Sequence, residues 1–348
     1  MNITGLRNDI DALDDEILQR LIIRAGFAEQ IAALKAEAGE STRDADREAE
    51  ILDRLCAMDL GPVSADDVRH VWRAVLASSR RMMDQSRDLL VCEQRARRPI
   101  SIGALDLFKP HAETPELIAG PCAIEDAEIV SATAAALAKA GVRILRGGAF
   151  KPRTSPYSFQ GLGEEGLGIL AYAAREHGMA CISEVLDTRT VKEVARYVDI
   201  IQIGTRNMAN FELLKEVGAT RKPVLLKRGF AATVDEWIHS AEYLAVNGCN
   251  DIIMCERGIR TFSDASRFTI DFAAVAEVQA RTWMPVVVDV SHAAGRRELV
   301  PPLFKAAIAC GADGVMVEVH ACPDRARCDS RQQLTPDAFA DLVKGVHS

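Results

Sequence analysis

Aromatic residues make up only 5% of this 348-residue chain, and no stretch of eighteen residues is free of charge. Because a membrane-spanning helix needs about 20 mostly apolar residues, the sequence predicts none. The nine cysteines lack paired spacing, which indicates reduced thiols rather than a disulfide framework. The start, MNITGLRNDIDALDD, is too acidic for a transit peptide, and we expect a cytoplasmic protein.

Excess positive charge is also missing. The chain has 42 Lys and Arg against 50 Asp and Glu, a net charge of −8. Bulk attraction to nucleic acid or to an anionic membrane is therefore not expected. An anionic substrate would have to be held by a local cluster of cations. With 48% hydrophobic residues, the chain can form one large core or two ordinary ones.

The first 90 residues show only helical periodicity. Apolar residues recur at steps of three and four over residues 3–36, which predicts one amphipathic helix. A break at 38–42 precedes a second predicted helix that ends near Leu60. A third helix is predicted from Ser64 to about residue 87. We therefore expect an all-helical domain over residues 1–90.

After a weakly patterned stretch over 91–113, which we interpret as a linker, the rhythm changes. Over residues 114–348, short apolar runs alternate with segments long enough for a helix, which is typical of βα units. Eight such units favour a (β/α)8 TIM barrel over an open doubly wound sheet. The expected strands are 117–119, 142–145, 179–182, 200–203, 224–226, 252–254, 286–288 and 315–317.

Cations follow several of these predicted strands. In a (β/α)8 barrel, residues at the carboxyl ends of the strands meet at one mouth, where the chemistry takes place. Guanidinium and ammonium groups there suit phosphate and carboxylate groups, and six cations are more than one phosphate needs. Two anionic substrates are therefore expected; the alternative is that each cation pairs with a surface acid. The six are Arg146, Lys151, Arg153, Arg206, Lys227 and Arg257.

A second set of strand-end residues has the donor chemistry of a divalent-metal site. It combines one sulfur, one nitrogen and two carboxylates, a mixture that could hold Mn, Fe, Zn or Co. The four residues are Cys122, His292, Glu318 and Asp329, with His320 and Asp289 as competing ligands. The alternative is that Cys122 is an inert core residue, since a lone cysteine usually is.

Seven strings in the barrel half resemble 3-deoxy-D-arabino-heptulosonate-7-phosphate (DAHP) synthase, in the branch with a compact barrel. That family condenses phosphoenolpyruvate with erythrose 4-phosphate and depends on a divalent metal. The strings are GPCAIE (120–125), LRGGAFKPRTSPYSFQGLG (145–163), QIGTRNMANF (202–211), LLKRG (225–229), ERGIRTF (256–262), VDVSHAAGRR (288–297) and GVMVEVH (314–320).

The resemblance implies a role for each matching residue. The metal ligands would be Cys122, His292, Glu318 and Asp329. The carboxylate of phosphoenolpyruvate would meet Arg146 and Lys151, and its phosphate would meet Arg206, Lys227 and Arg257. Arg153, Thr154 and Ser155 would hold the phosphate of erythrose 4-phosphate. Lys151 would also transfer protons as the catalytic residue, and Glu184 would position water.

The match departs from the family pattern beside two of the ligands. Asp289-Val290-Ser291-His292 stands where the family has D-P-S-H, and Cys328-Asp329-Ser330 stands where it has S-D-G. Neither change removes a ligand. Cys328 next to a ligand suggests a hypothesis of oxidative inactivation through a disulfide with Cys122.

Two cations of the first predicted helix lie in phase with its apolar seam. Arg24 and Lys35 are eleven residues apart, or three turns, so they share a face and either extend to solvent or line an anion site. Residues 3–83 resemble the all-helical class of chorismate mutase, an entwined dimer. The resemblance implies that Arg24 and Lys35 act in catalysis, and that chorismate is also bound by Arg7 from the partner, Asp44, Arg47, Glu48 and Ser79.

Met83 stands where that class has Gln or Glu over the breaking ether oxygen. Losing such a hydrogen bond costs about two to three orders of magnitude in rate. Three alternatives stay open. The chain is a synthase and a mutase, a synthase whose helical domain only senses chorismate or prephenate, or a sister enzyme that uses arabinose 5-phosphate. An entwined dimer with further barrel contacts would make a homotetramer.

Overall fold

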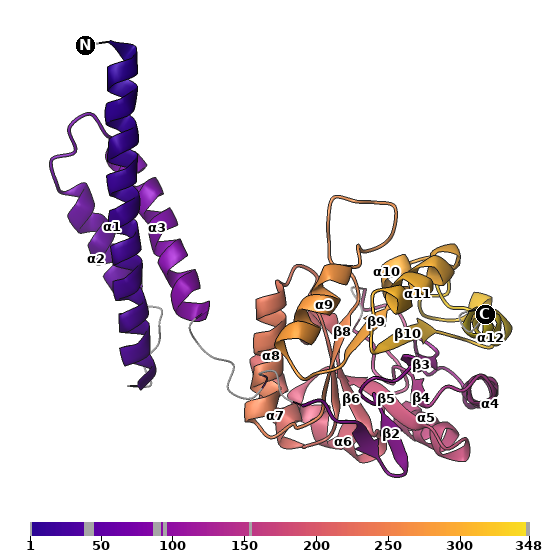
Figure 1. Cartoon of the computed structure of the whole chain (residues 1–348). Coiled ribbons are helices and arrows are strands. Elements are labelled where there is room, and N and C mark those ends of the chain that lie inside the picture. Colours follow the sequence, from indigo (N-terminus) through magenta and orange to yellow (C-terminus); the bar gives the residue numbers. More distant parts are fainter. Residues whose placement is uncertain (1, 38–44, 86–91, 93–95, 153–154, 346–348) are drawn as a thin grey trace. The chain divides into compact units, whose positions relative to one another are not determined.

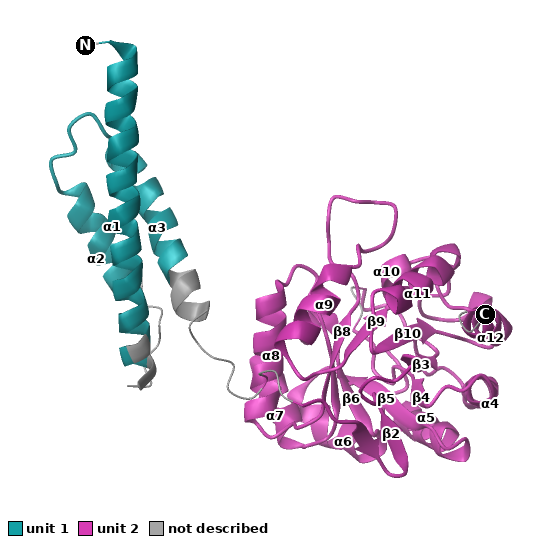
Figure 2. Cartoon of the chain, in the orientation of Figure 1, with its two compact units in different colours: residues 1–88 teal, residues 89–348 magenta. Residues whose placement is uncertain are grey.

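The computed structural model describes residues 2–37, 45–85, 92, 96–152 and 155–345. The chain forms two compact units, Met1–Asp88 and Leu89–Ser348 (Figure 2). Among the described helices, none is long and apolar enough to cross a lipid bilayer.

The described residues of the first unit form three helices, as predicted. They are α1 (Ile3–Glu37), α2 (Ala45–Cys56) and α3 (Ala65–Gln85). The Ser64 hydroxyl accepts a hydrogen bond from the Asp67 backbone N–H at 3.1 Å, which caps the start of α3. The second helix is shorter than expected, because α2 ends at Cys56 and a turn with Gly61 at φ 53° follows.

The second unit is a closed barrel of eight parallel strands, in the order β10-β3-β4-β5-β6-β7-β8-β9. All eight predicted strands are confirmed, with ends that differ by at most three residues. They are β3 (Glu116–Gly120), β4 (Ile144–Arg146), β5 (Ala180–Val185), β6 (Ile200–Ile203), β7 (Val224–Lys227), β8 (Ile252–Glu256), β9 (Val286–Asp289) and β10 (Gly314–Glu318).

Helices surround this barrel (Figure 1). They pack their apolar faces on the outer faces of the strands, so each strand is buried on both sides, which explains the continuous apolar runs in the sequence. The helices are α4 (Ala127–Lys139), α5 (Glu164–Glu176), α6 (Val191–Tyr197), α7 (Phe211–Ala219), α8 (Val234–Val246), α9 (Phe272–Arg281), α10 (Val290–Ala294), α11 (Val300–Ala309) and α12 (Pro336–Lys344).

The linker predicted over 91–113 is wrong for its later part. Strands β1 (Ile100–Ile102) and β2 (Leu105–Leu107) form an antiparallel hairpin there, and Ile100 and Leu107 pack against the apolar residues inside the barrel. Arg97 also forms an ion pair with Asp313 at 2.9 Å. Strands of three residues are too short to show a period in the sequence, so the pattern could not identify them.

Candidate active site at the carboxyl end of the barrel

A cavity of about 530 Å³ lies at the carboxyl ends of the strands. Parallel strands end at the same rim, so the last residues of several strands contribute to it. Of the predicted site residues, Arg146, Lys151, Ser155, Glu184, Arg206, Lys227, Arg257, His292 and Asp329 line the cavity, as does Cys328. Arg153 and Thr154 lie outside the described residues.

Two glycines allow the walls of this cavity to approach one another. Gly120, at the end of β3, has φ 149°, and a Cβ there would lie 2.0 Å from the carbonyl oxygen of Arg146. A Cβ at Gly204, which follows β6, would lie 1.9 Å from Oε1 of Glu184. Glu184 occupies the space that a side chain at 204 would fill, and its Oε2 accepts a hydrogen bond from Gln202 at 3.3 Å.

The four predicted metal ligands come together from four separate segments. One donor atom from each of Cys122, His292, Glu318 and Asp329 lies within 4.8 Å of the other three. Nε2 of His292 lies 3.4 Å from Glu318 Oε1 and 3.7 Å from Asp329 Oδ2. The Cys122 sulfur lies 3.6 Å from the same Asp329 oxygen.

Asp289, considered above as a competing ligand, supports the cluster from behind. Its Oδ2 lies 2.7 Å from Nδ1 of His292 and 2.5 Å from Nζ of Lys227. The carboxylate therefore holds His292 with Nε2 facing the cluster, as residues behind metal-bound histidines commonly do. Its side chain also accepts from the His292 backbone N–H at 3.1 Å and caps α10.

His320 has a different place from the one considered for it. It is fully buried, and its Nδ1 accepts a hydrogen bond from the backbone N–H of Cys322 at 2.9 Å. Burial lowers the pKa of His320, so its ring is neutral. Within the described part of the chain, four residues bring their donor atoms together, and His320 is not among them.

The charges of the cluster keep its carboxylates ionised. Burial opposes ionisation of Asp289, but the imidazole of His292 and the ammonium of Lys227 outweigh it and hold its pKa well below the usual range. The pKa of Glu318 is also lowered, because His292 and Arg146 outweigh its burial. The four donors then offer sulfur, imidazole nitrogen and two anionic oxygens, a set that fits Mn, Fe, Co or Zn.

Two cations connect the cluster to the cavity. Arg146 donates to Glu318 Oε1 at 2.8 Å and to the carbonyl of Pro121 at 2.9 Å. Lys151 donates to the carbonyl of Cys122 at 3.0 Å, and its Nζ lies 3.3 Å from the Cys122 sulfur. Burial opposes the charge of Lys151, but the sulfurs of Cys122 and Cys328 outweigh it and raise its pKa, so its ammonium stays protonated.

Four arginines gather on an aromatic platform that the sequence analysis missed. Phe230 and Phe268 stack with ring centroids 5.3 Å apart. The guanidinium carbon of Arg257 lies 4.0 Å from the Phe268 centroid, and that of Arg260 lies 4.8 Å from the Phe230 centroid. Arg206 and Arg267 also lie over these rings. The only signal for Arg260 was its place within ERGIRTF (256–262).

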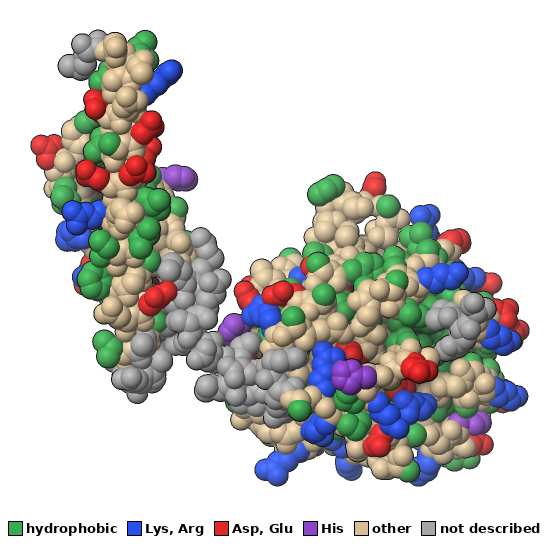
Figure 3. All heavy atoms as spheres, in the orientation of Figure 1, with side chains coloured by type: hydrophobic (Ala, Val, Ile, Leu, Met, Phe, Trp, Pro, Cys, Tyr) green, Lys and Arg blue, Asp and Glu red, His purple; other side chains and the backbone are tan. Residues whose placement is uncertain are grey.

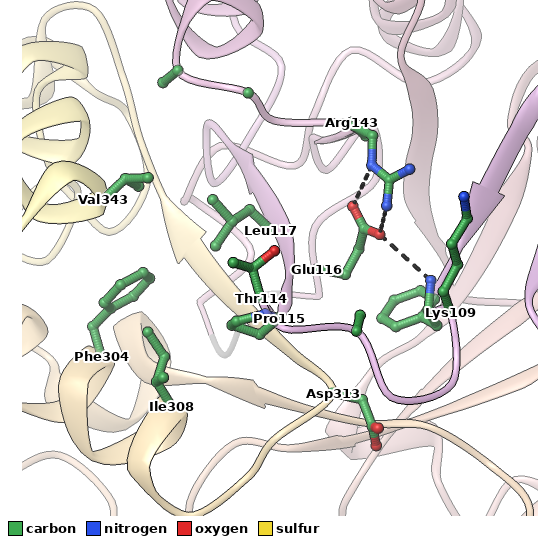
Figure 4. Close-up of a pocket in the computed structure, with 14 residues that line it drawn as sticks. Lys109, Thr114, Pro115, Glu116, Leu117, Arg143, Phe304, Ile308, Asp313 and Val343 are labelled. Atoms are coloured by element: carbon green, nitrogen blue, oxygen red, sulfur yellow. Dashed lines mark hydrogen bonds and ion pairs between the residues drawn. The ribbon is translucent and has the colours of Figure 1, made fainter. Parts of the chain in front are cut away.

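A second cavity, of about 420 Å³, is shown in Figure 4. It lies at the amino ends of the strands, where its floor includes Glu116 and Leu117 of β3. Its buried carboxylate, Glu116, already pairs with Arg143, and the Phe108 N–H donates to it at 3.4 Å. Barrel chemistry takes place at the other end, so the cavity with the converging charges is the candidate active site.

The helical unit brings two of its predicted site residues together. Arg24 donates to the Ser79 hydroxyl at 2.5 Å, and its guanidinium carbon lies 5.8 Å from the ring centroid of Trp72. Arg47 forms an ion pair with Glu50 on the surface at 2.8 Å. Glu48 lines a groove of about 590 Å³ between α2 and α3.

Two further predicted residues of this unit lie toward the ends of α1. Lys35 is half-buried near the end of α1, and Arg7 is exposed near its start. Asp44 and the side chain of Met83 lie outside the described residues.

Comparison with known proteins agrees with this geometry. The model of the DAHP synthetase I family matches residues 101–347. The chain belongs to the DAHP synthetase I family. A second family model, chorismate mutase type II, matches residues 6–84, so the chain also carries a chorismate mutase domain.

Relatives support the barrel assignment. The phospho-2-dehydro-3-deoxyheptonate aldolase of Thermotoga maritima is 53% identical over 228 residues, which are 66% of this chain and 68% of that protein. A crystal structure of that aldolase superposes with a TM-score of 0.69 at 48% identity, covering 72% of this chain and 73% of the other. The 2-dehydro-3-deoxyphosphooctonate aldolase of Methylococcus capsulatus is 33% identical over 246 residues, 66% of this chain and 86% of that protein.

Proposed function

We propose that this member of the DAHP synthetase I family condenses phosphoenolpyruvate with erythrose 4-phosphate, giving 3-deoxy-D-arabino-heptulosonate 7-phosphate and phosphate. The observation that carries the proposal is the position of the four metal-type donors beside a buried group of cations in one cavity. A divalent ion (Mn, Fe, Co or Zn) held by Cys122, His292, Glu318 and Asp329 would supply a Lewis acid for the aldehyde oxygen.

The cations divide between two anionic substrates. Arg146 and Lys151 face the carboxylate of phosphoenolpyruvate, and Arg206, Lys227 and Arg257 bind its phosphate. Arg153, Thr154 and Ser155 bind the phosphate of the aldose. Support comes from burial, since Arg146, Lys227 and Arg257 are at most 4% exposed and a desolvated cation attracts an anion far more strongly than a surface one.

The reaction joins C3 of the enol phosphate to the aldehyde carbon, and Lys151 donates the proton that turns the aldehyde oxygen into a hydroxyl. Its raised pKa suits a group that arrives protonated. Water adds to the electron-poor C2 and gives up a proton to Glu184. The resulting phosphohemiketal then loses phosphate through cleavage of the bond between C2 and the phosphate oxygen. The C2 hydroxyl gives its proton to Lys151 as it becomes the ketone carbonyl, Glu184 passes its proton to the departing phosphate, and the phosphate-binding cations stabilise the departing charge.

The test measures phosphate release with both substrates, before and after treatment with a chelator, and with each metal added back. Arg206→Gln should raise the KM for phosphoenolpyruvate about 10- to 100-fold, because a lost charge-assisted hydrogen bond costs about 1.5–3 kcal/mol. Arg196→Gln is the matched control, since Arg196 forms only a surface ion pair with Glu164 and should leave the KM within twofold. Equal effects would contradict the assignment.

Substrate choice separates this proposal from the sister activity on arabinose 5-phosphate. The greater identity to the heptonate aldolase, 53% against 33%, favours the four-carbon aldose. Turnover should therefore be faster with erythrose 4-phosphate than with arabinose 5-phosphate at equal concentrations. Faster turnover with arabinose 5-phosphate would show that the chain has the sister activity instead.

We further propose that the helical unit binds chorismate or prephenate through Arg24, Lys35 and Ser79, with Asp44, Arg47, Glu48 and the partner's Arg7. It converts chorismate to prephenate, or it senses one of them for the barrel. Turnover of chorismate by the wild type and by Met83→Gln separates the two. If the wild type is as fast as the variant, the sensor reading fails; if only the variant is active, the mutase reading fails.

Exposed apolar residues of α1 favour a homo-oligomer. Its side chains Ile10, Leu13, Ile17, Ile22 and Phe27 are all more than half exposed, and Figure 3 shows green apolar surface along the helical unit. Such exposed apolar surface is stable in water when a second copy covers it. We expect a dimer through the helical unit and a tetramer through added barrel contacts. The described cysteines form no disulfides, which agrees with a cytoplasmic location.

A further inference from the structure

Two adjacent glutamines occupy the segment that follows the ligand Asp329. Gln332 and Gln333 are 2% and 0% exposed. A buried amide is costly unless both its oxygen and its nitrogen find partners. Neither glutamine lines the 530 Å³ cavity, so they do not belong to its substrate-binding surface.

Gln332 binds the two carboxylates of the metal-type cluster. Its Nε2 donates to Glu318 Oε2 at 2.7 Å and to Asp329 Oδ2 at 3.3 Å. Its Oε1 accepts from Arg267 at 3.4 Å, which determines which way the amide faces. With Oε2 of Glu318 held by Gln332, only Oε1 faces His292, and that atom also accepts from Arg146.

Gln333 joins the two loops that carry the sulfurs. Its Oε1 accepts from the backbone N–H of Cys122 at 2.9 Å, and its Nε2 donates to the carbonyl of Cys328 at 2.8 Å. The two sulfurs lie 3.1 Å apart between these loops. An amide both donates and accepts without bringing charge, whereas a carboxylate at either position could not donate to these acceptors.

We propose that Gln332 and Gln333 are positioning residues of the metal centre. Gln332 holds Glu318 so that it presents one oxygen and aligns Asp329 beside it, and Gln333 sets the position of the Cys122 sulfur. The inference rests on the proposed function, which supplies the ion. Together with Asp289 behind His292, the two glutamines give every one of the four ligands a supporting residue.

The experiment replaces each glutamine by methionine, which keeps the side-chain length and removes all the hydrogen bonds of the amide. Cobalt(II) is titrated into the chelator-treated full chain against a competing chelator, and the visible spectrum is recorded. Gln332→Met should weaken cobalt binding about 10- to 100-fold and change the d–d bands. Gln333→Met should weaken it similarly and reduce the thiolate-to-cobalt charge-transfer band.

Gln279→Met is the matched control. The amide of Gln279 also donates to a carboxylate, Asp313 Oδ2, and to a backbone carbonyl, that of Gly311, but next to the amino end of β10. It should leave cobalt affinity within twofold and the spectrum unchanged. If a methionine variant does not fold, Gln332→Asn and Gln333→Asn keep the amide but withdraw it by one methylene, and the same losses are expected.

The outcomes separate the two levels of the argument. A wild-type chain that binds no cobalt refutes the proposed metal-dependent function itself. A wild-type chain that binds cobalt, with glutamine variants that match its affinity and spectrum, leaves the function standing and overturns the positioning role.

Discussion

Replacing Asp289 by asparagine tests whether one buried carboxylate organises both parts of the barrel site. Asp289 is fully buried and contacts His292 on the metal side and Lys227 on the side of the cations. Asn has nearly the same shape, so the change removes the charge and leaves the volume. The amide has a single oxygen, so it cannot replace both carboxylate oxygens as acceptors, and it no longer neutralises the ammonium of Lys227.

The magnitude follows from these two contacts. A hydrogen bond to a charged group contributes about 1.5–3 kcal/mol, which corresponds to about 10- to 100-fold in binding. Asp289→Asn should therefore weaken metal binding about 10- to 100-fold through His292. The KM for phosphoenolpyruvate should rise by a similar factor through Lys227, even at saturating metal.

The dependence on pH has a definite sign. Because the pKa of Asp289 is held well below its usual range, its contribution to the free energy of unfolding is complete above the unfolded-state pKa of about 4. That contribution is lost only as the pH falls through the depressed folded-state value. The stability difference between wild type and Asp289→Asn should therefore be constant from pH 8 to pH 5 and shrink in stronger acid.

The assay combines metal titration, steady-state kinetics and unfolding in urea. Asp271→Asn is the control: Asp271 also pairs with a buried cation, Arg228, at 3.0 Å, and caps α9, where Asn serves equally well. It should leave metal affinity within twofold. If Asp289→Asn behaves like this control in both metal affinity and KM, Asp289 does not organise the site.

Three further predictions concern single side chains. Peroxide should inactivate the wild type by oxidising the thiols of Cys122 and Cys328, whose sulfurs lie 3.1 Å apart, to a disulfide with loss of two protons and two electrons. Added thiol should restore the activity, and Cys328→Ser should resist inactivation by peroxide. If that variant is inactivated and restored like wild type, Cys328 is not the partner. Gly204→Ala should lower kcat at least tenfold, because the added methyl group displaces Glu184. An unchanged kcat would show that Glu184 does not act on the water in the reaction. Burial raises the pKa of Cys181 to about 12, so iodoacetamide at pH 8 should modify it only after denaturation, as mass spectrometry of the native chain would check.

Much of the barrel could be predicted because its signals are local. Each strand is an apolar run buried on both faces, so its period and length show in neighbouring residues. The residue at the end of a strand is then at the mouth by topology alone, which is why Arg146 and Lys227 could be placed there from the chain order.

The supporting residues left no such signal. Gln332 reaches Glu318 across fourteen positions, and Gln333 reaches Cys122 across 211. The choice between Asp289 as a ligand and Asp289 as the residue behind His292 depends on side-chain directions that the chain order does not contain. The hairpin of β1 and β2 was missed for a related reason, since its stability comes from closing the barrel interior.

The amino-acid sequence by itself determined the two units, the eight-stranded barrel and the kinds of charge at its mouth, because these depend on periodicity and on order along the chain. Only the tertiary structure decided which donors meet, which carboxylate supports the histidine, and which arginines share the Phe230–Phe268 platform. Those contacts join residues far apart in the chain, and a distance of a few ångströms between them exists only once the barrel has closed.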